Sequence, residues 1–584
     1  MKVLYILPFH NSSAALFDNN QCLAYLHEEK FNNLKNYWGF PLLSLEYLHK
    51  NYNLSNLDKI VFSSKQLFLS CVPSQKNNLT QISENFLTNN LKKHISTLGY
   101  YINPKIFSIF RNFFIDSVIS PLARKKMTSF LSNQYKISSN NIYYFDHHTC
   151  HALSPIHFYN LHHSKKKTLI FTADGSGDNC SSKLFIYSPK KGLKEVSKSP
   201  YYASLGLLFS GATEYLGMKP NEHEYKVMGL AAYVSDKKYY QPILDKLNQI
   251  ISLNKQSLSF ESSINLNNST KFFAKNFSNI RFDNISAGVQ VFIQDLILNW
   301  IKLTIKKYKI NQIACSGGLF MNVKLNKMIQ ELPEVKKVYF MPSAGDDSLG
   351  YGASFIANKK QISDFSLYKG VSYSENQIQE YLSNISNNHS FSITYKKDVV
   401  KTIAKLLSKK EIVGWFQGKG EWGARSLCNR TILANSSDYR SYNQVNDTIK
   451  MRDFWMPFAP TMLYDWAPKY ILNWKKTESK IKESSKYMIT AFDTTPLAQK
   501  HLLAATHQKD HTIRPQLVQK NDNPLLYKML KEYEKLTGMG GLMNTSLNIH
   551  GYPLVGTIEQ AVFTFQNSNL KYLVIDNYLL TKNE

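Results

Sequence analysis

The sequence predicts an α/β protein in which a duplicated α/β core is followed by a second, smaller α/β lobe. A strand, a short polar turn and a second strand open the chain, and the same pattern returns near residue 168. Two strand–glycine turn–helix units then follow between residues 312 and 357. With 584 residues, 43% of them hydrophobic, the chain is long and apolar enough for several folded units.

The two hairpins are the first elements that the pattern defines. A hairpin turn signal follows the first one at residues 18–20, and Asp174, Gly175 and Gly177 form the turn of the second. This arrangement resembles the start of actin-like and sugar-kinase-like nucleotide-binding folds, in which the turn faces phosphate. The expected strands lie at residues 2–8, 15–17, 168–173 and 183–187.

Residues 64–135 separate the two hairpins and are basic, aromatic and helical in pattern, which indicates an insertion. After the second hairpin, Gly317 and Gly318 follow one apolar strand and Asp346 follows the next. Glycine amides and helix N-termini placed in this way bind anions. The expected elements are a helix at 286–305, strands at 312–315 and 337–341, and helices that end at 327 and 357.

The second lobe begins after residues 359–375, which carry no strong pattern. We therefore expect a first domain at 1–365 and a second domain at 366–584. In the second domain a helix is expected at 399–407, a strand at 411–417 and a closing strand at 572–576.

Composition narrows the function classes. The net charge of +27 would suit a nucleic-acid or acidic membrane partner, but lysine is abundant throughout and no nucleic-acid motif occurs, so we assign the excess to solvated faces. The most apolar stretch, residues 289–301, is broken by polar residues, and residues 1–9 are too short for a signal peptide. Six scattered cysteines indicate reduced thiols. We expect a cytoplasmic protein without a membrane span or nucleic-acid partner.

The sharpest local signal for chemistry is a histidine-rich segment at residues 146–152. His147 and His151 are four residues apart, so a helix would place both imidazoles on one face, where they could hold one metal ion. The alternative is that these histidines only start and cap a helix. Asp346 is the candidate third ligand. Imidazoles with a carboxylate suit Fe²⁺, with Mn²⁺ or Zn²⁺ as alternatives.

Cationic residues in the second lobe sit beside glycine turns or strand ends instead of along a polar helix stripe. They indicate either solvated faces or a site for a small phosphorylated substrate. Lys226 also has two alternative roles, since its segment could be a half-buried helix or could place this lysine beside a phosphate. The candidates for nucleotide and phosphate binding are Asp174, Gly175, Gly177, Lys226, Gly317, Gly318, Asn322, Arg425, Arg430, Lys450, Arg452, Arg514 and Ser546.

Taken together, these segments resemble the NodU/CmcH family of ATP-dependent O-carbamoyltransferases. Order and spacing agree along most of the chain, except at 64–135, 234–280 and 361–398. The matching phrases are residues 28–31 with 40–41, 147–152, 224–231, 316–322, 345–346, 414–430, 457–460, 514–516 and 544–546.

The resemblance implies an N-terminal ASKHA domain (the actin and sugar-kinase superfamily) and a C-terminal YrdC-like domain. The second would activate carbamoyl phosphate with ATP and Mg²⁺ to a carbamoyl-adenylate, and the first would transfer the carbamoyl group to a hydroxyl of a sugar, glycan or other polyhydroxylated acceptor. His147, His151 and Asp346 match the metal ligands of the family. His10 matches its proposed general base, and Arg425, Lys450, Arg514 and Ser546 match its carbamoyl phosphate and nucleotide contacts.

The chain departs from the family pattern at Asn11, Met456, His550 and Tyr552. Asn11 stands where an acidic residue usually follows the base, which bears on how His10 is oriented. Two other functions stay open: an enzyme of the tRNA threonylcarbamoyl-adenosine pathway, and a catalytically dead nucleotide- or RNA-binding module. The acceptor, the metal and the oligomeric state, with a homodimer among the alternatives, are not defined by these patterns.

Overall fold

The structure is a computed structural model that describes residues 1–19, 21–73, 103–358, 366–386 and 390–583. The chain divides into two compact units. The first comprises Met1–Leu23 and Tyr37–Phe365, and the second comprises Ala24–Asn36 and Ser366–Glu584. The grouping of Ala24–Asn36 with the second unit differs from the expectation that residues 1–365 form one domain.

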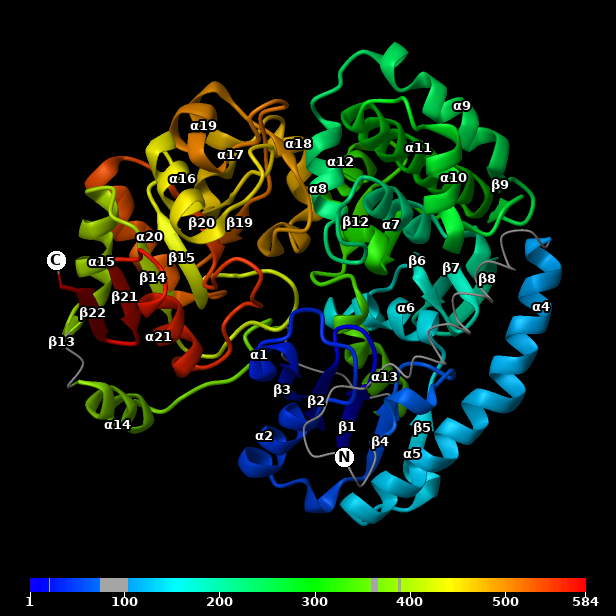
Figure 1. The fold of residues 1–584 in the computed structure, drawn as a ribbon, viewed down its shortest axis with the longest axis horizontal. Helices are drawn as coiled ribbons and strands as arrows, with labels where there is room; N and C mark the ends of the chain where they lie inside the picture. The colour runs from blue at the N-terminus through cyan, green and yellow to red at the C-terminus, as the bar shows by residue number, and fades with distance from the viewer. Residues whose placement is uncertain (20, 74–102, 359–365, 387–389, 584) are drawn as a thin grey trace. The chain divides into compact units, whose positions relative to one another are not determined.

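Two five-stranded sheets with the same strand order build the first unit (Figure 1). The order is β3-β2-β1-β4-β5 in one sheet and β8-β7-β6-β11-β12 in the other. In each, the leading strand pairs antiparallel with the second strand of its hairpin and parallel with the next strand along the chain. This repeat confirms the predicted duplicated α/β core. The strands are β1 (Lys2–Leu7), β2 (Ser13–Asp18), β3 (Gln21–His27), β4 (Lys59–Phe62), β5 (Ile142–Tyr144), β6 (Thr168–Gly177), β7 (Cys180–Ser188), β8 (Gly192–Pro200), β11 (Gln312–Ser316) and β12 (Lys337–Phe340).

Helices and a small hairpin complete the first unit. One core cluster joins Ile156 of α6 to Ile170 of β6, Phe185 of β7 and Ala314 of β11, so the helix that carries the histidines is packed against the second sheet. The helices are α2 (Leu42–Tyr52), α4 (Pro104–Phe114), α5 (Ser120–Tyr135), α6 (His147–Phe158), α7 (Leu205–Tyr215), α8 (Glu224–Ala231), α9 (Gln241–Ile250), α10 (Ser269–Asn276), α11 (Phe282–Tyr308), α12 (Val323–Glu331) and α13 (Leu349–Asn358), and the hairpin is β9 (Ile251–Asn254) with β10 (Ser259–Ser262).

The second unit is a mixed eight-stranded sheet in the order β13-β22-β21-β14-β15-β20-β16-β19. The last strand is β22, which follows the expected closing strand β21 and pairs antiparallel with it. The strands are β13 (Phe391–Tyr395), β14 (Val413–Phe416), β15 (Arg430–Ala434), β16 (Ala459–Leu463), β19 (Gln516–Val518), β20 (Gly541–Ser546), β21 (Tyr572–Ile575) and β22 (Tyr578–Lys582), with a separate hairpin of β17 (Phe492–Asp493) and β18 (Thr512–Ile513). The helices are α1 (Glu29–Asn32), α14 (Glu375–Ile385), α15 (Val399–Ser408), α16 (Tyr439–Val445), α17 (Ala467–Tyr470), α18 (Trp474–Ile481), α19 (Pro496–His501), α20 (Pro524–Thr537) and α21 (Ile558–Gln566).

The N-terminal segment Ala24–Asn36 is held in the second unit by buried contacts. Tyr25 stacks on Trp422 with ring centroids 4.8 Å apart, and the Gly423 amide donates to His27 Nε2 at 3.1 Å. The Lys30 ammonium donates to the main-chain carbonyl of Glu421. All of these side chains are buried. The second unit therefore takes part of its core from the first forty residues of the chain.

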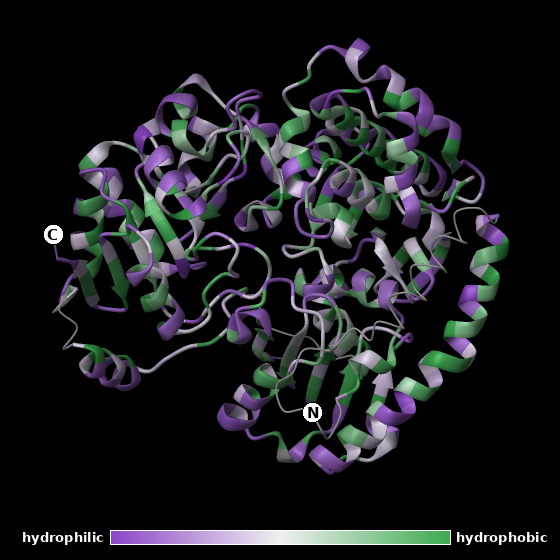
Figure 2. Ribbon diagram, viewed as in Figure 1, coloured by the Kyte–Doolittle hydropathy of each residue, from purple (hydrophilic) through white to green (hydrophobic). Residues whose placement is uncertain are grey.

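The expected insertion at residues 64–135 lies partly outside the described residues. Its described part contains α4 and α5, which a five-residue π-helical turn, Ile115–Ile119, joins into one long helix (Figure 1). By length and composition alone, the helix Pro104–Tyr135 is long and apolar enough to cross a membrane. Only 22% of its most apolar stretch is buried, and hydrophobic residues recur along it (Figure 2).

Candidate functional site

Four side chains from separate segments of the first unit form a cluster of nitrogen and oxygen atoms. His147 and His151 come from α6, Asp174 from β6, and Asp346 from the turn before α13. One ligand atom of each lies within 4.8 Å of all the others. His151 Nε2 is 2.9 Å from Asp174 Oδ2 and 3.4 Å from Asp346 Oδ1. His147 Nε2 is 3.5 Å from Asp346 Oδ1. The structure thus brings together the three candidate metal ligands that the sequence suggested and adds Asp174 as a fourth candidate.

The position of His147 depends on two acidic residues that hold the start of α6. Asp146 is the N-cap: its side chain accepts from the Thr149 amide at 2.8 Å and pairs with Lys183 at 3.0 Å. Asp178 accepts from the His147 amide at 2.8 Å and from the Ser64 hydroxyl at 2.7 Å. An N-cap side chain satisfies an amide that the helix itself leaves free. Together the two carboxylates fix the first turn of α6.

Charge in the cluster sets the protonation of the histidines. Burial alone would lower the pKa of His147, but the Asp346 and Asp174 carboxylates raise it to about 9. Burial, together with its two histidine neighbours, lowers the pKa of His148 to about 3, so that residue is neutral. The His148 ring bonds to the Thr172 hydroxyl and the Cys180 carbonyl instead of joining the cluster. The carboxylates therefore favour a cation beside the two imidazoles.

The residues of the cluster fit a divalent metal ion. Among the residues that the structure describes, His147 Nε2 and Asp346 Oδ1 are buried atoms without a hydrogen-bond partner, and an ion between them would satisfy both. The other nitrogen of His151 lies 3.2 Å from the Ser316 hydroxyl, an outer contact of the kind that orients metal-bound imidazoles. Two imidazoles and two carboxylates without a thiolate suit Fe²⁺, Mn²⁺ or Zn²⁺.

Two glycines are required by close approach around the cluster. Gly317 has a φ of 103°, and a Cβ there would lie 2.2 Å from the Ala173 carbonyl. A Cβ at Gly177 would lie 2.1 Å from the His147 ring. These contacts give both glycines a packing role beside the metal cluster, whereas their predicted role in phosphate binding remains a prediction. The predicted role of Gly175 and Gly318 in phosphate binding also remains a prediction. The Gly175 amide bonds to the Asp174 carboxylate at 2.6 Å.

Two further residues that the sequence predicted as nucleotide contacts, Asn322 and Lys226, lie at or within helices of the first unit. Asn322 is the N-cap of α12, accepting from the Leu325 amide at 3.0 Å, and it exchanges hydrogen bonds with Gln290. Its side chain is therefore used within the protein, which points to a structural role. Lys226 lies half-buried in α8, one turn before the buried Gly229–Ala231 end of that helix.

His10 lies in the turn between β1 and β2, directly after the first strand. Burial raises the pKa of the Glu224 carboxyl at the start of α8, and the charge of the nearby His10 opposes that rise. Hydrogen bonds from backbone amides and from Ser210 oppose the rise more strongly than His10 does. Asn11, which stands where the family has an acidic residue, has a left-handed φ of 57°.

The second unit holds a separate group of cations. Burial, followed by the charges of Arg425 and Arg452, lowers the pKa of Arg514 well below its usual range. The buried Lys450 ammonium donates to the carbonyl and hydroxyl of Ser546 at 2.5 and 3.2 Å and to the carbonyl and side-chain oxygens of Asn548 at 2.9 and 2.6 Å. Its three protons are therefore used within the protein, as those of the terminal Arg430 nitrogens are, and a direct contact with a phosphate remains a prediction. Burial and the neighbouring charges of Arg452 and Lys35 lower its pKa as well. Cations that destabilise one another in this way form a site for an anionic ligand.

Arg430 does not belong to this group by its contacts. Its two terminal nitrogens donate to four main-chain carbonyls, those of Gln417, Asn429, Val371 and Gly418, at 2.6 to 3.0 Å. The side chain is 1% exposed and stacks on the Phe416 ring at 3.6 Å. A guanidinium whose terminal donors are used up has none of them left for a phosphate. These contacts give Arg430 a structural role, contrary to its prediction as a ligand contact.

Sequence reasoning missed three features of these sites. It assigned Asp174 to the nucleotide, although an acidic residue at the carboxyl end of a strand beside a histidine-bearing helix also suits a metal. It gave no role to Asp178, four residues further on. Lys35 could not be assigned to the cation group, because no local pattern ties residues 24–36 to the second unit.

Comparison with known proteins identifies the family. The model of the carbamoyltransferase N-terminus matches residues 2–355, and that of the carbamoyltransferase C-terminus matches residues 404–582. The chain is 29% identical to the uncharacterized protein MJ1058 of Methanocaldococcus jannaschii, over 93% of this chain and 91% of that one. It is 24% identical to the nodulation protein NolNO of Sinorhizobium fredii, over 98% of this chain and 79% of that one.

Among solved structures, full-length HypF in its phosphate- and nucleotide-bound form is similar over 61% of this chain and 55% of that one, at 11% identity. Its TM-score of 0.33 is too low to carry an argument. The two family models, in contrast, together account for most of the chain and lie in the expected order. The protein therefore belongs to the carbamoyltransferase family.

Proposed function

We propose that this carbamoyltransferase activates carbamoyl phosphate with ATP and transfers the carbamoyl group to a hydroxyl of a sugar or another polyhydroxylated acceptor. The observation that carries the proposal is the cluster of two imidazoles and two carboxylates in the first unit, with His10 on the first hairpin of the same unit. The cation group of the second unit supplies the complementary half, a site for phosphate.

Activation belongs to the second unit in this proposal. Carbamoyl phosphate is a small dianion, and Arg425, Arg452 and Arg514 neutralise it and hold its carbonyl in place, while the buried Lys450 adds charge and fixes Ser546 beside them. Its bond to phosphate is cleaved by water, and the carbamate oxygen then attacks the α-phosphorus of ATP, which Mg²⁺ accompanies. The products are carbamoyl-adenylate, phosphate and pyrophosphate.

Transfer belongs to the first unit. His10 takes the proton of the acceptor hydroxyl, the hydroxyl oxygen attacks the carbamoyl carbon, and AMP leaves. His147, His151, Asp174 and Asp346 would hold a divalent ion, for which Fe²⁺ is the first choice, and the ion would supply positive charge beside the phosphate of the departing AMP.

Release of pyrophosphate tests the first step. We expect release from ATP only when carbamoyl phosphate is also present, and we expect Arg514→Met to abolish it. Arg440→Met is the matched control, because Arg440 is an exposed arginine of the same unit that pairs with Asp438. Release without carbamoyl phosphate would contradict the proposal. Release that instead requires threonine and bicarbonate would favour the tRNA threonylcarbamoyl-adenosine pathway.

The second step is tested by mass. Acceptor candidates such as aminoglycosides, oligosaccharides and nucleotide sugars are incubated with ATP and carbamoyl phosphate, and the products are examined for the gain of one carbamoyl group. The gain should disappear when the acceptor hydroxyls are blocked. If adenylate is formed but the carbamoyl group is found on amines and on no hydroxyl, transfer to oxygen would be contradicted.

A further inference from the structure

The long helix formed by α4, the π-helical turn and α5 carries an apolar face that the described residues leave exposed. Phe110 and Phe113 are 72% and 69% exposed, and Ile109 is 68% exposed. The exposed apolar side chains recur every three or four residues, so they form one stripe along the helix. The stripe consists of Ile106, Ile109, Phe110, Phe113, Phe114, Val118 and Leu122.

The opposite side of α4 is less apolar than this stripe. The residues that α4 buries are Pro104 and Ser108. An ordinary surface helix buries its large apolar side chains and exposes its polar ones. The inverted pattern of α4 means that its most hydrophobic face is directed away from the fold of the first unit. Exposed apolar patches of this kind mark contact surfaces.

The same helix is strongly basic. Residues 104–136 contain six lysines and arginines and a single acidic residue, Asp116. In α5, Lys125 and Lys126 are exposed three and four residues after Leu122, so the outward stripe changes from apolar to basic along the helix. An apolar stripe followed by basic residues is the pattern of helices that lie in a membrane interface.

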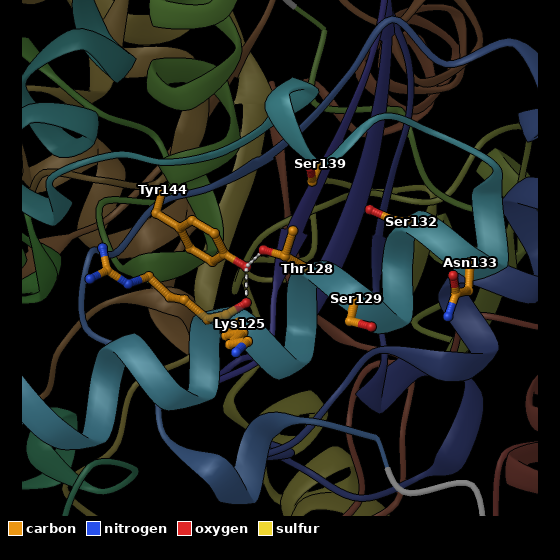
Figure 3. A pocket seen from close by; sticks show the side chains of 8 residues that line it. Lys125, Thr128, Ser129, Ser132, Asn133, Ser139 and Tyr144 are labelled. Carbon is orange, nitrogen blue, oxygen red and sulfur yellow. Dashed lines mark hydrogen bonds between the residues drawn. The ribbon is translucent and has the colours of Figure 1, made fainter.

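A depression on α5 adds a second observation (Figure 3). It has a volume of about 550 Å³ and is lined by Arg124 and Lys125 together with hydroxyl and amide side chains, and no acidic side chain is among its lining residues. The Ser132 hydroxyl is a buried atom without a hydrogen-bond partner in the described structure. Two cations and several hydroxyls in one hollow suit the phosphate and polar head of an anionic lipid.

The helix is fixed to the first unit in a way that favours lying on a membrane over crossing it. Arg111 donates to Asn179 at 3.2 Å, and Asn179 donates to Asp116 at 2.8 Å. Gln66 also donates to Asp116, at 2.7 Å, and Ala123, Met127 and Leu131 of α5 are fully buried. A helix that crossed the bilayer would have to break all of these contacts.

We propose that the exposed face of α4 and α5 binds an anionic lipid surface, with the apolar stripe in the headgroup boundary and the basic residues of α5 on the lipid phosphates. A second copy of the chain is the less favourable occupant, because it would bring one Pro104–Tyr135 helix of net charge +4 against another. An anionic lipid surface neutralises that charge while it covers the apolar stripe.

Vesicle binding by the full chain tests the proposal. Wild type should sediment with vesicles of phosphatidylcholine and phosphatidylglycerol, and much less with phosphatidylcholine alone. Phe110→Glu with Phe113→Glu should lower the bound fraction by about tenfold, and Lys125→Glu with Lys126→Glu should do the same and remove the dependence on salt. Phe282→Glu is the matched control, because Phe282 is 52% exposed at the start of α11 and should bind as wild type does.

A label at the stripe gives a second measurement that does not depend on the glutamate variants. All six cysteines are buried, so a cysteine introduced by Ile109→Cys can be labelled selectively with an environment-sensitive fluorophore. Its emission should shift to the blue with anionic vesicles, whereas a label at Phe282→Cys should not respond. Absent sedimentation of wild type, or an unresponsive label at position 109, would overturn the proposal. So would a vesicle-free dimer that Phe110→Glu with Phe113→Glu converts to a monomer, because the stripe would then be covered by a second copy.

Discussion

The ion pair between Asp146 and Lys183 should stabilise the helix that presents the histidine cluster. The two side chains are 3.0 Å apart and only 18% and 8% exposed. Burial opposes ionisation of Asp146, but Lys183 and the Thr149 hydrogen bonds lower its pKa from 3.8 to about 2. Replacement by asparagine, Asp146→Asn, keeps an acceptor for the helix cap and removes the charge.

The magnitude follows from the pKa of Asp146. A depression of nearly two units corresponds to about 2.5 kcal/mol at neutral pH, at roughly 1.4 kcal/mol per unit. Since the pKa is lowered on folding, this stabilisation is complete above about pH 5 and decreases as the pH falls through 3.8 towards 2. By pH 3 it should be about half of its neutral value. Lys183 retains Glu195 as a partner at 3.1 Å, so the loss is not increased by an unpaired lysine.

Hydrogen exchange measured by mass spectrometry reports this change locally. In Asp146→Asn at pH 7, the amides of α6 should exchange roughly 50-fold faster than in wild type, because the free energy of local opening falls by about 2.5 kcal/mol. Lys183→Met should have a similar effect, and the double variant should be no worse than either single one. Lys194→Met is the matched control, an exposed lysine of the neighbouring strand β8. Exchange in Asp146→Asn within twofold of wild type would refute the reasoning.

Three further predictions concern the proposed chemistry. His151→Ala should lose bound metal and transfer while the chain stays folded, because it removes a buried ligand atom; undiminished metal by elemental analysis would contradict this. His10→Asn should form adenylate normally but transfer it about 100- to 10,000-fold more slowly in a single turnover, and a normal transfer rate would exclude His10 as the base. Pyrophosphate release should decrease as the pH rises, at a pH below the usual lysine range, because burial and neighbouring cations lower the pKa of Lys450. Lys450→Arg should move the decrease to higher pH, and an unchanged profile would argue against a charged Lys450 in the first step.

Local patterns were sufficient for much of the fold. The expected strand at 2–8 is observed as Lys2–Leu7, and the expected helix at 399–407 as Val399–Ser408. Both are continuous apolar or amphipathic runs between clear turn signals, so the local sequence is sufficient to predict where they begin and end. His147 and His151 share a helix face for the same reason, since a spacing of four is a property of the helix itself.

Other features depend on contacts between distant residues. Asp174 joins the cluster because β6 pairs with β11, which aligns strand ends 140 residues apart in the chain. Arg425 and Arg430 are five residues apart and look equivalent in the sequence, yet the Arg430 side chain, at the start of β15, is enclosed by four carbonyls. Which face of α4 is exposed also could not be read from periodicity, because a stripe has the same period whether it points inward or outward.

The assignment of Ala24–Asn36 to the second unit has a consequence for how the protein is made. A ribosome releases this segment about 330 residues before Ser366, the first residue of the remainder of that unit. Trp422 and Gly423 follow about 400 residues after Tyr25 and His27, so at 5 to 20 residues per second the segment waits roughly 20 to 80 s for them. During that interval its side chains that later become buried are exposed to chaperones and to nascent neighbours. A cut of the gene between codons 365 and 366 would make this wait permanent, so this carbamoyltransferase cannot be divided into two independent domains there.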